Sequence, residues 1–143
     1  MADSTATITV FPYPKGVDNT QRCEVLRGTI SVTQGHYPSG PNGTGWPLSW
    51  ANIEGLKAIP PGSTTPSSTG SITPINVDVH SAASPPSGIV YIWDNVFGNL
   101  HAYISADASS NSSGPLIEYG GAVIPQYIIN DVIQFEAWFT KNN

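Results

Sequence analysis

The three histidines, His36, His80 and His101, have the widest chemical range of any side chains in this sequence. Asp78 and His80 lie two positions apart in an alternating segment, so on a strand they would share one face. With His101 from a neighbouring strand they would supply a carboxylate and two imidazoles, a donor set that can hold a metal ion. The alternative is that Asp78 and His80 form the solvent face of a strand. Because the sequence does not bring His101 next to them, we predict no metal site.

Other catalytic patterns lack the local context that their chemistry needs. Gly40, Gly43 and Gly45 lie in a loop with Pro and Asn, and not between a strand and a helix, so they indicate a turn and not a phosphate-binding loop. No Gly-x-Ser-x-Gly nucleophile elbow occurs. None of the ten acids is marked as half of a glycosidase pair. We therefore predict a protein that is not an enzyme, with no catalytic residues and no cofactor.

Aromatic residues in or beside loops are candidates for binding. Loop aromatics can stack on sugar rings or anchor a protein interface, and they can equally fold back over the ends of a domain. The candidate interface combines loop and N-terminal aromatics with prolines of a long central loop: Phe11, Tyr13, Tyr37, Trp46, Trp50, Pro60, Pro61, Pro66 and Phe97.

The distribution of charge excludes some partners. Only 10% of the residues are charged, and the net charge is −5. Between Lys57 and Lys141 there is no Lys or Arg, although six acids fall in that part of the chain. A nucleic-acid-binding protein carries a basic stripe, so we expect no nucleic acid. No apolar run is long enough to cross a membrane, and the first residues lack the pattern of a signal peptide.

Cys23 is the single cysteine. No intramolecular disulfide can form, and a lone thiol on a predicted strand is usually a small core residue. We predict that Cys23 is structural and that neither a disulfide nor a metal supports the fold.

The elements that must position these side chains are strands. A charge-poor chain with 14 Gly and 13 Pro favours strands joined by turns. Residues 5–10, 72–80 and 133–139 alternate between apolar and polar, which predicts half-buried strands. Residues 88–105 predict a β-hairpin, with a short turn rich in Asn and Gly.

Two segments carry more specific predictions. In residues 21–33 the apolar positions change parity near Gly28, which indicates a β-bulge. Residues 89–93 are apolar on both faces, which is typical of a central strand.

The uncharged stretch AIPPGSTTPSSTGS, residues 58–71, is either a linker between two domains or a loop within one. The first 57 residues predict too few strands for a domain of their own, and the later strands need cover. We therefore predict an all-β fold with one domain, a β-sandwich or small jelly-roll-like barrel with long Pro/Ser/Thr/Gly loops. Residues 1–20 form an N-terminal arm with the first strand, residues 21–143 form the sandwich, and residues 58–71 are a loop and not a linker.

One long run resembles a known class of proteins. The run PLSWANIEGLKAIPPGSTTPSSTGSITPINVDVHSAASPPSGIVYIWDNVFGNLHAYI, with TATITVF before it and DVIQFEAWF after it, resembles short virion proteins of tailed bacteriophages, in particular capsid decoration or cement proteins. The resemblance covers nearly the whole chain. It contains no catalytic or ligand motif, so no functional residue carries over.

The resemblance implies a β-rich protein on the capsid surface of a virion, made in the host cytoplasm. Its partners would be the major capsid protein and neighbouring copies of itself, which in this class often form trimers. We expect the arm to contact a neighbouring copy or the shell, and residues 60–70 to become ordered on assembly. The alternatives are a carbohydrate- or receptor-binding module of a fibre or tail, and a small hydrolase.

Overall fold

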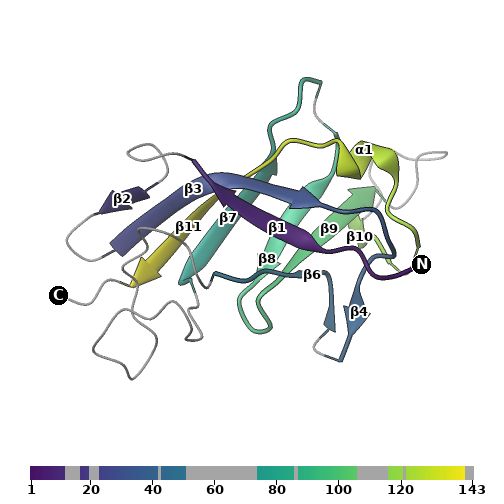
Figure 1. Ribbon diagram of the computed structural model, residues 1–143, viewed down its shortest axis with the longest axis horizontal. Helices are drawn as coiled ribbons and strands as arrows, with labels where there is room; N and C mark the ends of the chain where they lie inside the picture. The colour runs from purple at the N-terminus through teal and green to yellow at the C-terminus, as the bar shows by residue number, and fades with distance from the viewer. Residues whose placement is uncertain are drawn as a thin grey trace.

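The structure is a computed structural model. It describes residues 1–11, 17–19, 23–41, 43–50, 74–85, 87–105, 116–120 and 122–140. Its elements in chain order are β1 (Ala6–Val10), β2 (Val17–Asn19), β3 (Cys23–Val32), β4 (Ser39–Gly40), β5 (Gly43–Thr44), β6 (Trp46–Pro47), β7 (Asn76–Ser81), β8 (Val90–Asp94), β9 (Asn99–Ser105), β10 (Leu116–Glu118), α1 (Gln126–Ile129) and β11 (Ile133–Thr140) (Figure 1).

The first sheet has five antiparallel strands. Its order is β1-β3-β11-β7, and β2 pairs with β3 alongside β1. The long strands β3 and β11 form its centre, with Ile30 opposite Ile133 and Cys23 opposite Thr140. Because β3 precedes residue 58 and both β7 and β11 follow residue 71, strands from both parts of the chain share this sheet.

The second sheet has four strands and is built on the hairpin of β8 and β9. β9 pairs with β8 on one edge, and with β6 and then β10 on the other. The hairpin turn contains Gly98 at φ 73°, a left-handed conformation that glycine adopts without strain. A separate two-stranded hairpin, β4–β5, precedes β6.

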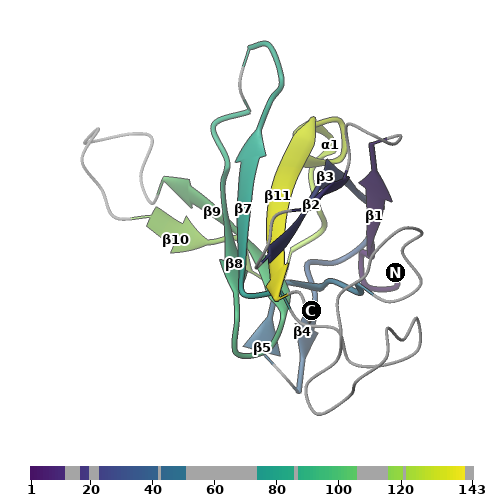
Figure 2. The ribbon, with the colours of Figure 1, turned by 90° about the vertical axis from the view of Figure 1, so that its left-hand side faces the viewer.

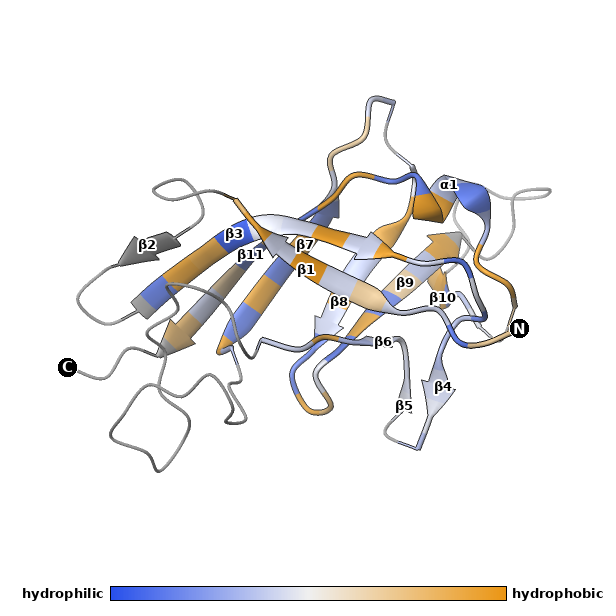
Figure 3. Cartoon of the chain, in the orientation of Figure 1, coloured by the Kyte–Doolittle hydropathy of each residue, from blue (hydrophilic) through white to orange (hydrophobic). Residues whose placement is uncertain are grey.

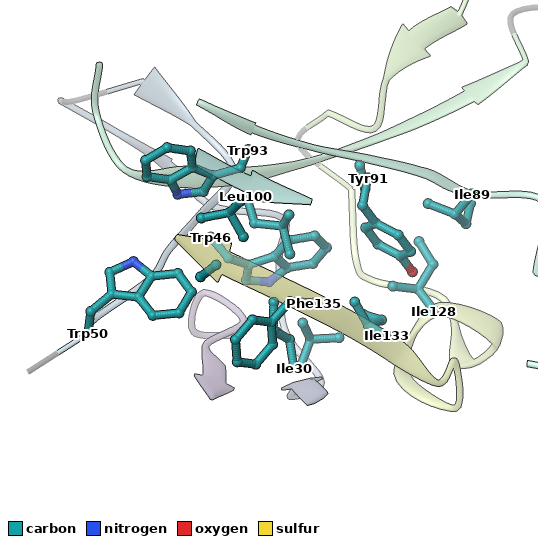
Figure 4. Packing of buried hydrophobic residues seen from close by; sticks show 14 of the residues in the cluster. Ile30, Trp46, Trp50, Ile89, Tyr91, Trp93, Leu100, Ile128, Ile133 and Phe135 are labelled. Carbon is teal, nitrogen blue, oxygen red and sulfur yellow. The ribbon is translucent and has the colours of Figure 1, made fainter. Parts of the chain in front are cut away.

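The two sheets enclose one hydrophobic core. Residues of both sheets and of α1 contribute fully buried side chains, including Ile30, Leu100, Ile128 and Phe135 (Figure 4). Along β7 and β11 the apolar residues alternate with polar ones (Figure 3). This alternation turns one face of each strand toward the core.

The prediction of an all-β fold is confirmed. Strands dominate, and the four-residue α1 is the one α-helix in the described residues. The predicted strands at 5–10 and 133–139 and the hairpin in 88–105 correspond to β1, β11 and β8–β9. No helix in the described parts of the chain is long and apolar enough to cross a membrane.

The predicted bulge at Gly28 is wrong. The register between β3 and β11 runs without interruption from Ile30 opposite Ile133 to Cys23 opposite Thr140. A Cβ atom at position 28 would collide with the backbone carbonyl of Thr9. Gly28 is therefore required by the close crossing of β1 and not by an inserted residue.

The prediction that residues 89–93 form a central strand is also wrong. In the described part of the chain β8 pairs only with β9. β7 and β8 lie side by side where the two sheets meet (Figure 2), but they belong to different sheets. The side chains of Tyr91 and Trp93 face the core, whereas Val90 and Ile92 are exposed. Apolar residues on both faces of β8 thus reflect a buried face and an exposed apolar face.

Candidate functional site

Glu118 on β10 gathers polar side chains from several segments into one cluster. Its Oε1 atom accepts hydrogen bonds from Tyr37 Oη (2.8 Å) and Thr44 Oγ1 (2.6 Å). The same oxygen lies 2.5 Å from His101 Nδ1. The other imidazole nitrogen, His101 Nε2, lies 3.8 Å from a carboxylate oxygen of Asp94. We call these five residues the Glu118 cluster.

A gap along one edge of β9 explains the position of Tyr37. β6 pairs with the start of β9 and β10 with its end, and Ala102 lies between the two ladders. The Tyr37 hydroxyl accepts a hydrogen bond from Ala102 N (3.0 Å) and donates one to Glu118. Gly45 lets the chain pass close by, since it has a φ of 95° and a Cβ there would lie 2.6 Å from Leu100 O.

Hydrogen bonding keeps the Glu118 carboxylate ionised. Burial by itself would raise the pKa of Glu118, but the hydrogen bonds from Thr44, His101 and Tyr37 outweigh burial and lower that pKa. Burial raises the pKa of the Tyr37 hydroxyl far above its ordinary range, so it remains a neutral donor.

The Glu118 cluster has the geometry of a structural clamp. Glu118 Oε1 already has three partners, and both nitrogens of His101 face carboxylates. A general acid or base must reach a substrate proton, and these groups are directed at one another. Their chemistry here is to join β5, β9 and β10 to the segment that carries Tyr37.

A second carboxylate, Asp131, joins the loop after α1 to the start of β8. It accepts hydrogen bonds from Ser81 (2.6 Å), Ser87 (2.7 Å) and Tyr91 (2.7 Å). Burial acts to raise the pKa of Asp131, but these three bonds and the backbone amide of Val132 outweigh burial and lower it. We call Asp131 and its three side-chain donors the Asp131 cluster.

The three histidines considered for a metal site lie in different surroundings. Asp78 and His80 are exposed on the outer face of β7, as the alternative interpretation predicts, while His101 belongs to the Glu118 cluster. The backbone of His36 forms isolated β-bridges with the backbones of Asp3 and Val123. In the described residues no three His, Cys, Asp or Glu side chains come close enough to hold a metal ion.

An open cavity of about 530 Å³ lies beside the N-terminal segment. Residues 3–6 form one wall, the β4–β5 region another, and Phe97 and Asn99 of the β8–β9 hairpin close the third side. Phe97 is 57% exposed, so an aromatic ring is accessible at the rim. The cavity thus offers prolines, glycines and one aromatic face, without a basic side chain in its lining.

Three of the predicted interface residues belong to the core instead. Tyr37, Trp46 and Trp50 are between 0% and 3% exposed. The rings of Trp46 and Tyr37 meet edge to face with their centroids 4.9 Å apart. Trp50 packs edge to face on Phe135, with ring centroids 5.5 Å apart. Aromatic side chains bury a large apolar area, and in a domain with few apolar residues the loops fold inward to supply it. These side chains are not available to a partner.

The other predicted interface residues divide into two groups. Phe97 is exposed at the hairpin turn, and Phe11 is partly buried just after β1. Tyr13, Pro60, Pro61 and Pro66 lie outside the described residues, as do Pro60 to Gly70 as a whole.

Sequence reasoning missed an apolar surface on the outer side of the second sheet. Val90 lies opposite Tyr103, which lies opposite Glu118 on β10, so all three share one face. Ile92 and Leu116 are two positions from Val90 and Glu118 and lie on the same face. Val90, Ile92 and Leu116 are 40%, 48% and 50% exposed. We call Val90, Ile92, Tyr103 and Leu116 the outer apolar face. In the sequence, the apolar run of residues 89–93 was the pattern that could have indicated this face.

Comparison with known proteins does not identify the chain. No protein-family model matches it, and neither a curated protein nor a solved structure matches it. The resemblance to phage decoration proteins rests on the sequence pattern alone, so function is inferred from the chemistry of the surfaces.

Proposed function

We propose that this chain is a non-enzymatic structural protein of a virus particle, a decoration protein that binds the outer surface of a phage capsid and stabilises it. The observation that carries the proposal is the outer apolar face of the second sheet. Its exposed aliphatic side chains lie together on one ordered surface.

An exposed apolar cluster on an ordered sheet favours binding to another protein. The most prominent exposed apolar patch of a soluble protein is often an interaction site. The ionisable groups on this face, Asp94, His101 and Glu118, face one another: Glu118 is hydrogen-bonded to one nitrogen of His101, and Asp94 lies 3.8 Å from the other. A partner that covers the face would therefore bury aliphatic area without having to separate a new ion pair.

Such a surface suits a protein that stabilises a shell. A protein that binds the assembled shell and not its free subunits shifts the equilibrium toward the shell by mass action. A shell repeats the same site many times, so neighbouring copies add avidity to a modest individual interface. No catalytic step is needed, in accord with the structural role of the Glu118 and Asp131 clusters.

Co-sedimentation tests the proposal. The purified protein would be mixed with particles of the virus whose genome encodes it, and the particles would be sedimented through a density gradient. We expect the protein to sediment with the particles and to reach a fixed number of copies per particle. The variant Val90→Ser/Ile92→Ser should lose most of this binding.

The matched control is Thr29→Ser/Gln134→Ser, which alters the outer face of the first sheet and should bind like the wild type. A protein that stays in the supernatant at every concentration would show that it does not bind the shell. Equal loss of binding in both variants would show that the outer apolar face is not the contact.

The cavity beside Phe97 favours a second candidate, a carbohydrate- or receptor-binding module. Its volume of about 530 Å³ lies in the usual range of small-ligand sites, and Phe97 offers a ring for stacking. Against this candidate, Tyr37, Trp46 and Trp50 are buried and leave few aromatic rings around the groove. Glycan-array binding that disappears in Phe97→Ala would support it over the capsid proposal.

A further inference from the structure

β1 is an edge strand of the first sheet. In the described residues it pairs with β3 on one side and with no strand on the other. In Figure 2 it lies at the border of the sheet, away from β10. A strand at an edge presents a row of backbone N–H and C=O groups that another strand can pair with.

Two backbone hydrogen bonds show which residues of β1 bond to β3. Thr33 N donates to Thr5 O (2.9 Å), and Phe11 N donates to Arg27 O (3.0 Å). In an antiparallel pair the hydrogen-bonded residues alternate with residues whose backbone groups point away. The odd-numbered residues of β1 therefore bond to β3, and Ala6, Ile8 and Val10 direct their N–H and C=O groups to the open edge.

The sequence of this edge lacks the charges and prolines that protect many natural edge strands. Such strands usually carry Lys, Pro, a bulge or an inward charge, whereas residues 4–11 read STATITVF and include neither a charge nor a proline. Thr7 and Thr9 are exposed. At its start the segment Asp3–Ala6 lines the open cavity.

The sequence around Ile8 reads the same in both directions in chemical terms. A threonine lies on each side of Ile8, and beyond each threonine lies a small aliphatic residue, Ala6 or Val10. In an antiparallel pair of identical strands about a two-fold axis, residue i lies opposite residue j and j opposite i, so this pattern places chemically similar residues opposite each other. This pattern favours a second copy of the chain as the occupant of the edge over an unrelated strand.

We infer that β1 pairs with β1 of a second copy, antiparallel, about a two-fold axis beside Ile8. Ile8 would bond to Ile8 of the partner subunit, and Ala6 to Val10 of the partner subunit. Thr7 would then lie opposite Thr9 of the partner subunit, a cross-strand pair that stabilises sheets.

The position of Ser4 selects this register over one centred on Thr7. Ser4 N already donates to His36 O (2.8 Å), so the open edge begins after Ser4. A pair centred on Thr7 would place Val10 opposite Ser4 of the partner subunit and leave its bonds incomplete. Centring on Ile8 uses all three open residues, and it would join two five-stranded sheets into one continuous sheet. The inference concerns the isolated protein and does not depend on the proposed function.

Charge exchange across the two-fold tests this register. In Thr7→Lys/Thr9→Lys each introduced lysine would face another lysine, whereas in Thr7→Lys/Thr9→Glu each would face a glutamate. Both positions are exposed in the monomer, so the fold should persist. By sedimentation equilibrium we expect a wild-type dimer. The dissociation constant of the double-lysine variant should exceed that of the lysine–glutamate variant by about tenfold or more.

Amide hydrogen exchange of the wild type supplies a second readout that needs no variant. Exchange at Ala6, Ile8 and Val10 should slow as the protein concentration rises, while exchange at Thr7 and Thr9, which face β3, should not change. A wild type that is monomeric at all concentrations, or an assembly without a two-fold axis, would overturn the inference. So would equal dissociation constants for the two charge variants.

Discussion

The outer faces of the two sheets differ in chemistry although both lie on the surface. On the first sheet the outward residues of β3, β7 and β11 include Thr29, Asp78, His80 and an ion pair between Arg27 and Glu136. On the second sheet the outward residues of β8 are Val90, Ile92 and, at its end, Asp94, and the two aliphatic side chains are exposed. Figure 3 shows the alternation of hydropathy along the strands of the first sheet.

This difference distinguishes apolar residues that stabilise the fold from apolar residues that remain free to contact a partner. Both sheets bury one apolar face in the same core, which accounts for the inward apolar residues of the first sheet. On its outer side Val25 lies opposite Trp138, and Val25 is only 5% exposed, so it is already covered within the chain. The core does not account for the outward Val90 and Ile92. A polar outer face needs no partner in water, whereas an apolar one lowers its free energy when it is covered. This difference supports the proposal that the second sheet carries the recognition surface.

The largest expected effect is on the shared core. Leu26 on β3 is fully buried, and Leu26→Ala should lower the free energy of unfolding by about 2–5 kcal/mol, through lost burial and a cavity. Ile92→Thr on the outer apolar face should change it by less than about 0.5 kcal/mol. Urea unfolding measures both. A cost for Ile92→Thr as large as that for Leu26→Ala would mean that the second sheet has no free outer face.

The Glu118 cluster should give the next largest effect. Tyr37→Phe keeps the ring but removes the hydroxyl that bonds Glu118 and Ala102 N, so we expect a loss of about 1–3 kcal/mol. Tyr127→Phe is the matched control, because Tyr127 is exposed and should lose less than about 0.5 kcal/mol. Equal thermal midpoints for the two variants would show that the Tyr37 hydroxyl does not support the edge of β9.

Acid should weaken the fold through Glu118 and Asp131. Both have a lowered pKa in the folded state, so their contribution is fully present above the unfolded pKa values of about 4 and is lost as the pH falls through the lower folded values. The free energy of unfolding should therefore decrease below about pH 4. Asp131→Asn should show a smaller decrease than the wild type in urea titrations at neutral and acidic pH. An identical decrease would place the acid sensitivity elsewhere.

The ion pair on the first sheet should give the smallest effect. Arg27 Nε lies 2.7 Å from Glu136 Oε2, and both side chains are more than a third exposed. Glu136→Gln should lower the free energy of unfolding by about 0.2–1 kcal/mol, and added salt should remove the difference. A larger, salt-independent loss would show that the outer face of the first sheet is not simply solvated.

The candidate site was less predictable than the fold. The Glu118 cluster joins residues from Tyr37 to Glu118, 81 positions apart. No local pattern links such residues, because their contact depends on how β6 and β10 divide the edge of β9. The loop aromatics were candidates for an interface on the same evidence that made them candidates for the core. Burial of Trp46 and Trp50 was decided by which strands they cover.

The sequence by itself determined the strand-rich character, the β8–β9 hairpin and the absence of a basic stripe. Each of these follows from composition or from contacts between near neighbours, because side chains alternate along any strand. The tertiary structure alone decided that β8 exposes Val90 and Ile92, that Gly28 faces the backbone of β1, and that no described strand pairs with the outer edge of β1. These features depend on the order of strands in a sheet. That order is set by packing between segments far apart in the chain, about which alternation within one strand carries no information.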